Sequence, residues 1–174
     1  MKKLLILCLT LLLSFPAVFA MPADMVRISE AGGSFYIKEP NGVIYSYKKD
    51  DLASVPDFLY GSTINCVGNS LTITLFNSIN LYLEKSQSAF ITKDPITGEL
   101  IIMDKDGKSL NSASKIVFND NASAAFEAGA IISVLKTDSI IYLKVIRGSG
   151  RVKVTQGTKI TQAHEGNIFE IPNL

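Results

Sequence analysis

The sequence predicts an all-β protein built from many short strands in a sandwich- or solenoid-like arrangement. Two observations carry this prediction: apolar and polar residues alternate along many short runs, and turn-forming residues separate the runs. In residues 71–75 aliphatic side chains alternate with threonines, and residues 79–84 repeat the pattern after a break at Asn77-Ser78. Because successive side chains on a strand point to opposite faces, each run has one apolar face, and the two together predict a β-hairpin.

The same pattern recurs along the rest of the chain. Residues 35–37 and 43–45 flank the sequence Glu39-Pro40-Asn41-Gly42, where proline fixes φ and Asn-Gly tolerates positive φ, so a turn is expected. Further runs bounded by turn residues are 100–103, 140–146, 151–154, 158–161 and 167–171.

One segment has helical character. Residues 121–128 are rich in alanine, begin with a plausible cap at Asn121 and stop at Gly129. This predicts at most one short helix near 121–128, of one or two turns, because so short a helix is marginal by itself. A strand or loop is the alternative for this segment.

A faint internal repeat is also visible. Residues 71–83 resemble residues 130–143, with one inserted residue in the second copy. The likeness predicts either two structural halves or rungs, or two hairpins that look alike because hairpins share a pattern.

The first 20 residues predict an export signal. A basic start at Lys2-Lys3 precedes an apolar stretch over residues 4–13, and Val18-Phe19-Ala20 places small residues for cleavage after Ala20. The apolar stretch is shorter than the ~20 residues that a membrane-spanning helix needs, although an uncleaved anchor is the alternative. We therefore expect a bacterial protein that is periplasmic or secreted, with a mature part that does not span the membrane.

The remainder predicts one domain. Residues 21–33 are expected to be a flexible N-terminal segment, and residues 34–174 a single all-β domain. Without the signal the chain has one more acidic than basic residue, and this balance argues against a nucleic-acid partner. One cysteine, Cys66, lies in an alternating run, which indicates a small buried side chain; a reactive or dimer-forming thiol is the alternative.

Catalytic, cofactor-binding and metal-binding motifs are not found, so no such residues and no cofactor are predicted. His164 is the single histidine and lies in a sequence that predicts a turn. The run Asp104-Lys105-Asp106-Gly107 has two carboxylates but lacks the later oxygen ligands and closing glutamate of a calcium loop, which favours a hairpin turn.

Four residues are predicted to form a contact surface. Arg147 and Arg151 flank the turn Gly148-Ser149-Gly150, whose backbone N–H groups would be able to face an anion, although a plain hairpin loop is the stronger interpretation. Tyr45 and Tyr47 belong to an early group of aromatic residues that either stack on a ligand or pack across strands.

Two stretches of the chain resemble the FecR-type periplasmic domain. The first contains the residues Gly61-Ser62-Thr63-Ile64, 68–73, 79–83 and Ser86-Gln87-Ser88; the second contains 143–148, 152–154 and Glu165-Gly166-Asn167. The resemblance spans residues 34–172 and concerns the β-rich module of that family. It implies a stand-alone binding, scaffolding or sensory-interaction unit, and it does not imply signal relay to a sigma factor.

Two functional hypotheses follow. The first is a non-enzymatic module of the bacterial cell envelope that contacts an envelope protein or glycan through strand edges and loops. The second is a hydrolase acting on envelope polysaccharide or peptidoglycan, which would need carboxylates gathered in a cleft, with Glu99, Asp104, Asp106 and Glu165 as candidates.

Overall fold

The computed structural model describes residues 25–104 and 114–174, and within them the chain is almost entirely β-structure. The predicted signal at residues 1–20 and Asp106 lie outside the described residues. The elements are β1 (Met25–Ala31), β2 (Phe35–Lys38), β3 (Ile44–Tyr47), the 3₁₀ helix η1 (Lys49–Ser54), β4 (Phe58–Leu59), β5 (Ser62–Cys66), β6 (Ser70–Leu75), β7 (Ile79–Glu84), β8 (Ser88–Lys93), β9 (Leu100–Asp104), β10 (Ser114–Asn119), β11 (Ala122–Phe126), β12 (Ile131–Lys136), β13 (Ile140–Arg147), β14 (Val152–Gln156), β15 (Lys159–Ala163) and β16 (Ile168–Pro172).

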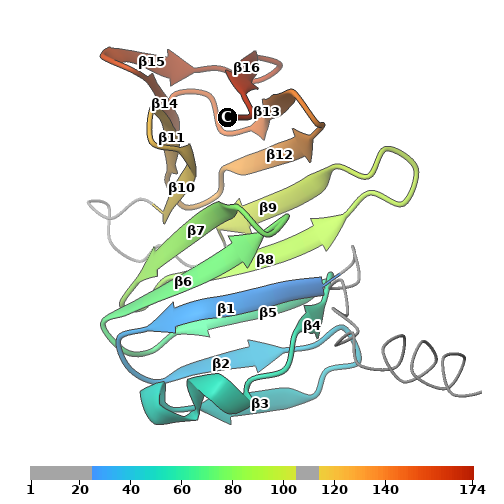
Figure 1. Cartoon of the computed structure of the whole chain (residues 1–174), viewed down its shortest axis with the longest axis vertical. Helices are drawn as coiled ribbons and strands as arrows, with labels where there is room; N and C mark the ends of the chain where they lie inside the picture. The colour runs from blue at the N-terminus through green and yellow to red at the C-terminus, as the bar shows by residue number, and fades with distance from the viewer. Residues whose placement is uncertain (1–24, 105–113) are drawn as a thin grey trace, which may run out of the picture.

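These strands form two sheets, and the predicted all-β sandwich is confirmed. Sheet I has the order β15-β14-β11-β10-β7-β6-β1-β4, and sheet II has the order β16-β13-β12-β9-β8-β5-β2-β3. Neighbouring strands are antiparallel, for example β6 with β7 and β12 with β13. From β6 onward the hairpins alternate between the two sheets, so the chain advances from its blue end to its red end as it builds both layers (Figure 1).

The core lies between the two sheets and follows the predicted period of two. In β7, Ile79, Leu81 and Leu83 are buried, while the residues between them are half-buried or exposed. Each fully buried aliphatic side chain contributes about 1.5–3 kcal/mol through removal of apolar surface from water. Because both sheets supply such faces along their length, a single hydrophobic core extends through the described part of the domain.

The alanine-rich segment is a strand, so residues 121–128 take the alternative that the sequence left open and form no short helix. Ala122–Phe126 forms β11, which pairs with β10 on one side and β14 on the other. Its side chains alternate between buried and half-buried, with Ala124 and Phe126 directed into the core. Pairing on both edges satisfies the backbone more fully than an isolated turn of helix could, and this tertiary context overrides alanine's preference. The helical turn found in the described chain is η1, at residues 49–54.

The N-terminal segment is also more ordered than predicted. Residues 25–31 form β1, which pairs with β6 and with β4, so the expectation of a flexible stretch over 21–33 is wrong for these residues. Val26 and Ile28 are buried in the core. Their alternation with polar neighbours is the signal that sequence reasoning overlooked.

The two segments of the faint repeat are both hairpins, but they occupy different sheets. Residues 71–83 lie in β6–β7 of sheet I, and residues 130–143 lie largely in β12–β13 of sheet II. In the alternating order of hairpins, β6–β7 corresponds to β10–β11 and not to β12–β13. The structure therefore favours two similar hairpins over a repeated rung.

Candidate functional site

The structure separates the four predicted contact residues into two distant pairs. Tyr45 and Tyr47 lie on β3, the outermost strand at one end of sheet II. Arg147 ends β13, and Arg151 belongs to the turn before β14, both toward the opposite end (Figure 1). The tyrosines and the arginines therefore do not form one surface.

The arginine turn is occupied by bonds within the protein. The Gly148 N–H donates to Glu165 Oε1 at 3.1 Å, and the Gly150 N–H donates to the Ala163 carbonyl at 3.0 Å. The Arg151 guanidinium donates to the Ala128 carbonyl at 2.7 Å. These bonds leave little of the turn to face an anion, which supports the interpretation of this segment as a hairpin loop.

The turn before β3 has the predicted form. Gly42 has φ of 87°, and the N–H of Val43 donates to Asn41 Oδ1 at 2.9 Å. The Gly42 N–H donates to the Glu39 carbonyl at 2.9 Å, which closes the turn. Glycine adopts positive φ without steric cost, and the asparagine side chain replaces a backbone partner. This local chemistry sets the register in which β3 lies beside β2.

The two tyrosines of β3 have different surroundings. Tyr47 is half-buried and stacks on Phe35 of β2, with ring centroids 5.4 Å apart and an interplanar angle of 28°. Burial raises the pKa of the Tyr47 hydroxyl, with smaller contributions from Tyr45 and Glu39. Tyr45 faces the same side of the sheet but is 43% exposed. Tyr47 is therefore a packing residue, and Tyr45 is the tyrosine available for contact.

The backbone of β3 has an unpaired side. Among the described residues β3 pairs with β2 alone. The Glu39 N–H donates to the Val43 carbonyl at 2.9 Å, so the Glu39–Val43 pair is of the hydrogen-bonded kind. Hydrogen-bonded and non-hydrogen-bonded pairs alternate along an antiparallel ladder, so the N–H and C=O groups of Ile44 and Ser46 point away from β2. These four groups face the open edge.

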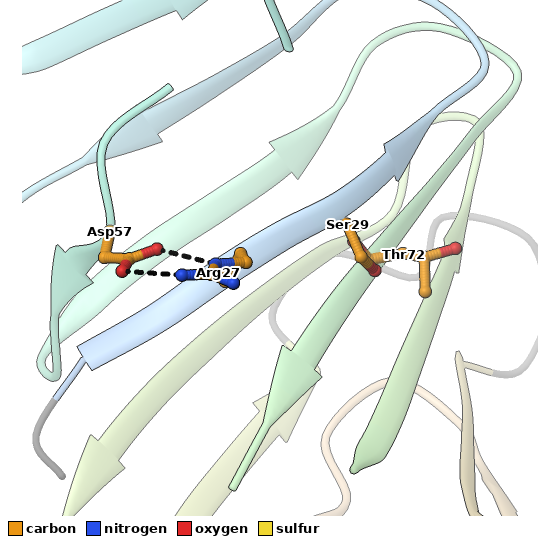
Figure 2. A network of polar contacts seen from close by, with 4 residues as sticks. All are labelled: Arg27, Ser29, Asp57 and Thr72. Atoms are coloured by element: carbon orange, nitrogen blue, oxygen red, sulfur yellow. Dashed lines mark hydrogen bonds and ion pairs between the residues drawn. The ribbon is translucent and has the colours of Figure 1, made fainter. Parts of the chain in front are cut away.

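Sheet I leaves the end of sheet II uncovered. Its last strand, β4, has two residues, and Leu52 of η1 and Val55 directly after η1 pack against the core. The connection between η1 and β4 is held to β1 by Arg27, whose Nε lies 3.1 Å from Asp57 Oδ1 and whose Nη2 lies 3.3 Å from Asp57 Oδ2 (Figure 2). The hydrogen bond with Asp57 raises the pKa of Arg27. At this exposed position the ion pair contributes at most about 1 kcal/mol.

Exposed apolar side chains gather along β3 and the residue before it. Val43 is 44% exposed and Ile44 is 57% exposed, and the strand itself carries no Lys, Arg, Asp or Glu. Proteins usually protect edge strands with charges, prolines or covering segments, because an open edge is a template for pairing with another strand. An unprotected apolar edge of this kind is a candidate binding site.

At the other end of sheet II, the outward backbone groups of β16 can be identified in the same way. The Asn173 N–H donates to the Ser139 carbonyl at 2.9 Å, so that pair is of the hydrogen-bonded kind. By alternation, the backbone groups of Ile168, Glu170 and Pro172 point away from β13.

Side chains from sheet I occupy two of these outward positions. Gln156 Nε2 donates to the Glu170 carbonyl at 2.9 Å, and Asn119 Nδ2 donates to the Pro172 carbonyl at 2.8 Å. Pro172 also lacks an N–H, so it cannot donate to another strand. The edge of β16 is therefore closed at the Glu170 and Pro172 carbonyls, in contrast with that of β3.

The outer strand of sheet I at this end, β15, is polar. It carries Lys159 and Gln162, and Gln162 Nε2 donates to the Gly150 carbonyl at 2.8 Å. Ile160 is exposed, but a charged residue on an edge disfavours pairing with another strand. Of the three edge strands β3, β15 and β16, β3 is the one that combines free backbone groups with an uncharged apolar surface.

The remaining candidate residues do not assemble into a site. Cys66 is 2% exposed, and burial raises the pKa of its thiol, so the prediction of a small buried side chain is confirmed. His164 is exposed in a turn closed by the Asn167 N–H, which donates to the His164 carbonyl at 3.0 Å. Within residues 25–104 and 114–174, no three His, Cys, Asp or Glu side chains are grouped so as to hold a metal ion.

Of the candidate hydrolase carboxylates that the structure describes, Glu99 and Asp104 lie at opposite ends of β9. Glu99 precedes β9 and Asp104 ends it, which separates their Cα atoms by roughly 17 Å at about 3.3 Å per strand residue. Asp104 is buried and accepts a hydrogen bond from the Ser114 hydroxyl at 2.9 Å. Glu165 lies in the turn between β15 and β16, where it caps Gly148. Paired carboxylates that cleave glycosides lie roughly 5–10 Å apart, and Glu99 and Asp104 do not approach that distance.

The fold and the edge define a class of protein, an antiparallel β-sandwich with one open apolar strand. Comparison with known proteins finds no matching family model, no matching curated protein and no matching solved structure. In the described part of the chain, no helix is long and apolar enough to cross a membrane. The resemblance to the FecR-type domain accordingly stays a prediction from sequence.

Proposed function

We propose that this chain is an exported protein of the bacterial cell envelope whose FecR-like β module acts as a non-enzymatic binding, scaffolding or sensory-interaction domain. The observation that carries this proposal is the open edge of β3, with outward backbone groups at Ile44 and Ser46 and an exposed Tyr45 beside them. The predicted export signal supports the location. The separation of Glu99 and Asp104 gives the hydrolase hypothesis no support from that pair.

The mode of binding that fits this edge is strand addition. An extended segment of a partner protein would pair with Ile44 and Ser46 through backbone hydrogen bonds, which supply affinity with little dependence on sequence. Alternate side chains of that segment would contact Val43 and Tyr45 on the face that sheet I leaves uncovered, and these contacts would supply specificity. A protein strand fits these groups better than a glycan, which cannot continue a backbone ladder.

The test is site-specific photocrosslinking in cells. A photoreactive phenylalanine analogue at Tyr45 should yield one reproducible crosslinked protein in the cell envelope. The same analogue at Tyr82, which is 37% exposed on β7 between two paired neighbours, is the matched control and should not yield that product. An absence of any reproducible product from position 45, or equal labelling from position 82, would overturn the proposal.

A further inference from the structure

The open edge of β3 is complementary to a second copy of itself. When two antiparallel strands are related by a two-fold axis, one residue of each lies opposite the same residue of the other. Because the outward groups of β3 belong to Ile44 and Ser46, the register that uses all of them places Ile44 opposite Ser46 of the second copy. We infer that β3 pairs with β3 of a second copy in this register, an inference that rests on the proposed binding role of the edge.

This register satisfies the backbone groups that the isolated chain leaves open. Ile44 of one copy exchanges two hydrogen bonds with Ser46 of the second copy, and the symmetric pair exchanges two more. Shifting the register by two residues would place one of these pairs in the turn at Gly42 or at Lys48, where η1 begins. The centred register therefore makes the fullest use of a four-residue strand.

The side chains on the face of Tyr45 are compatible in this register. Tyr45 lies opposite Tyr45 of the second copy in a non-hydrogen-bonded pair, where Cα atoms are about 4.5 Å apart and aromatic pairs stabilise the sheet. On the same face Val43 lies opposite Tyr47 of the second copy, so the uncovered apolar surface extends across the axis.

Charged side chains lie at the two ends of the pairing and not within it. Lys48 continues β3 in an extended conformation, with φ of −104° and ψ of 166°, and would lie opposite Gly42 of the second copy. Glu39 lies in the same turn as Gly42, to which it is bonded through its carbonyl. Alternation places Glu39 on the face of Tyr45 and Tyr47, and Lys48 on the face of Ile44 and Ser46, so these two charges do not meet across the pairing. Between these ends the strand has no charge to repel its copy.

The short strand limits how tightly two copies associate. A contact of four residues on each chain is smaller than the roughly 1,200–2,000 Å² of a stable protein interface. We therefore expect a dimer whose fraction rises with protein concentration, rather than a permanent one.

The test uses disulfide trapping in the chain purified after export. Tyr45→Cys should form a reducible dimer under mild oxidation, because Cα atoms in a non-hydrogen-bonded pair lie within the range that a disulfide spans. Ile44→Cys is the matched control, since Ile44 faces Ser46 of the second copy, and it should crosslink at least ~10-fold more slowly. Native Cys66 is buried and provides the background rate. Equal crosslinking from positions 44 and 45 would overturn the register.

A second variant separates pairing from folding. Ser46→Pro removes an N–H that points away from β2, so it should block association while leaving the β2–β3 ladder in place. In sedimentation experiments the native chain should show a mass that rises with concentration, and Ser46→Pro should stay monomeric. A native chain that is monomeric at every concentration up to ~1 mM, well above the range of typical weak complexes, would overturn the inference.

The photocrosslinking experiment at position 45 separates this inference from the proposed function. A product that joins two copies of the chain supports both. A product with a different envelope protein, without self-crosslinking, would overturn the homodimer and leave the binding role standing. The absence of both products would overturn both proposals.

Discussion

β3 and β16 are the two edge strands of sheet II, and they differ in how many of their outward backbone groups are bonded within the protein. Both strands are paired on one side, and both direct alternate N–H and C=O groups outward. At β16, side chains from β14 and β10 occupy two outward carbonyls, and a proline removes a donor. At β3 no bond of this kind is made in the described structure, and the exposed side chains are apolar. The contrast shows that this sheet closes part of one edge with specific bonds and leaves the other edge available.

The difference matters because open edges carry a risk of aggregation. A protein that keeps one apolar edge open while it closes the opposite one has either a partner for the open edge or a liability there. The short length of β3 limits the risk, since four residues make few hydrogen bonds with an unintended strand. These features favour a binding role for β3, and the following predictions test the contrast between the two edges.

The largest expected effect concerns the two tyrosines of β3. Tyr47→Ala should lower the free energy of unfolding by roughly 1–3 kcal/mol, because it removes the stacking on Phe35 and opens the core at this end. Tyr45→Ala should change it by less than about 0.5 kcal/mol, as expected of an exposed side chain. Urea unfolding at equilibrium measures both values. Similar losses for the two variants would show that Tyr45 is also a packing residue.

The next prediction opens the closed edge. Replacing Asn119 and Gln156 together by alanine should cost about 1–2 kcal/mol, since each removes one hydrogen bond to β16. It should also produce self-association through β16, visible by size-exclusion chromatography with light scattering.

The control for this prediction is Gln162→Ala. Gln162 also bonds a backbone carbonyl, that of Gly150, but away from the β16 edge. This variant should lose stability without new association. If the double variant stays as monomeric as Gln162→Ala, the two amides do not protect the edge.

The smallest expected effect is a dependence on alkaline pH. Burial raises the pKa of Tyr47 in the folded chain above its value of about 10 in the unfolded chain. Folding therefore favours the neutral hydroxyl of Tyr47. The stability that this preference contributes is complete below pH ~10 and is lost as the pH rises through the pKa of Tyr47 in the folded chain. Tyr47→Phe should remove this part of the alkaline loss of stability, as measured by urea midpoints between pH 8 and about 11. An unchanged pH profile would contradict the assignment.

Much of the fold was predictable because its signal is local. Alternation in residues 71–75 and 79–84 predicted a hairpin, and the structure has β6 and β7 there. The same rule would have predicted β1, since Val26 and Ile28 alternate with polar residues. The alanine-rich segment suggested a helix because alanine's helix preference is a local property. The segment forms β11 instead, because strands on both sides stabilise it.

The candidate site was predictable in part. Aromatic character indicated Tyr45 and Tyr47 as contact residues. Only the packing distinguishes them, because Tyr47 stacks on Phe35, whereas Tyr45 is exposed. Arg147 and Arg151 were grouped with them by charge and turn sequence, and the fold separates the two pairs.

The sequence alone determined where strands and turns lie and which face of each strand is apolar, because these follow from the period of two and from residues such as Pro40, Asn41 and Gly42. Only the tertiary structure decided which strand edges are open. The contacts that close an edge join residues far apart in the chain, such as Asn119 with Pro172 across 53 positions and Gln156 with Glu170 across 14. No local pattern encodes such distant bonds, so the open edge of β3 became visible only once both sheets were assembled.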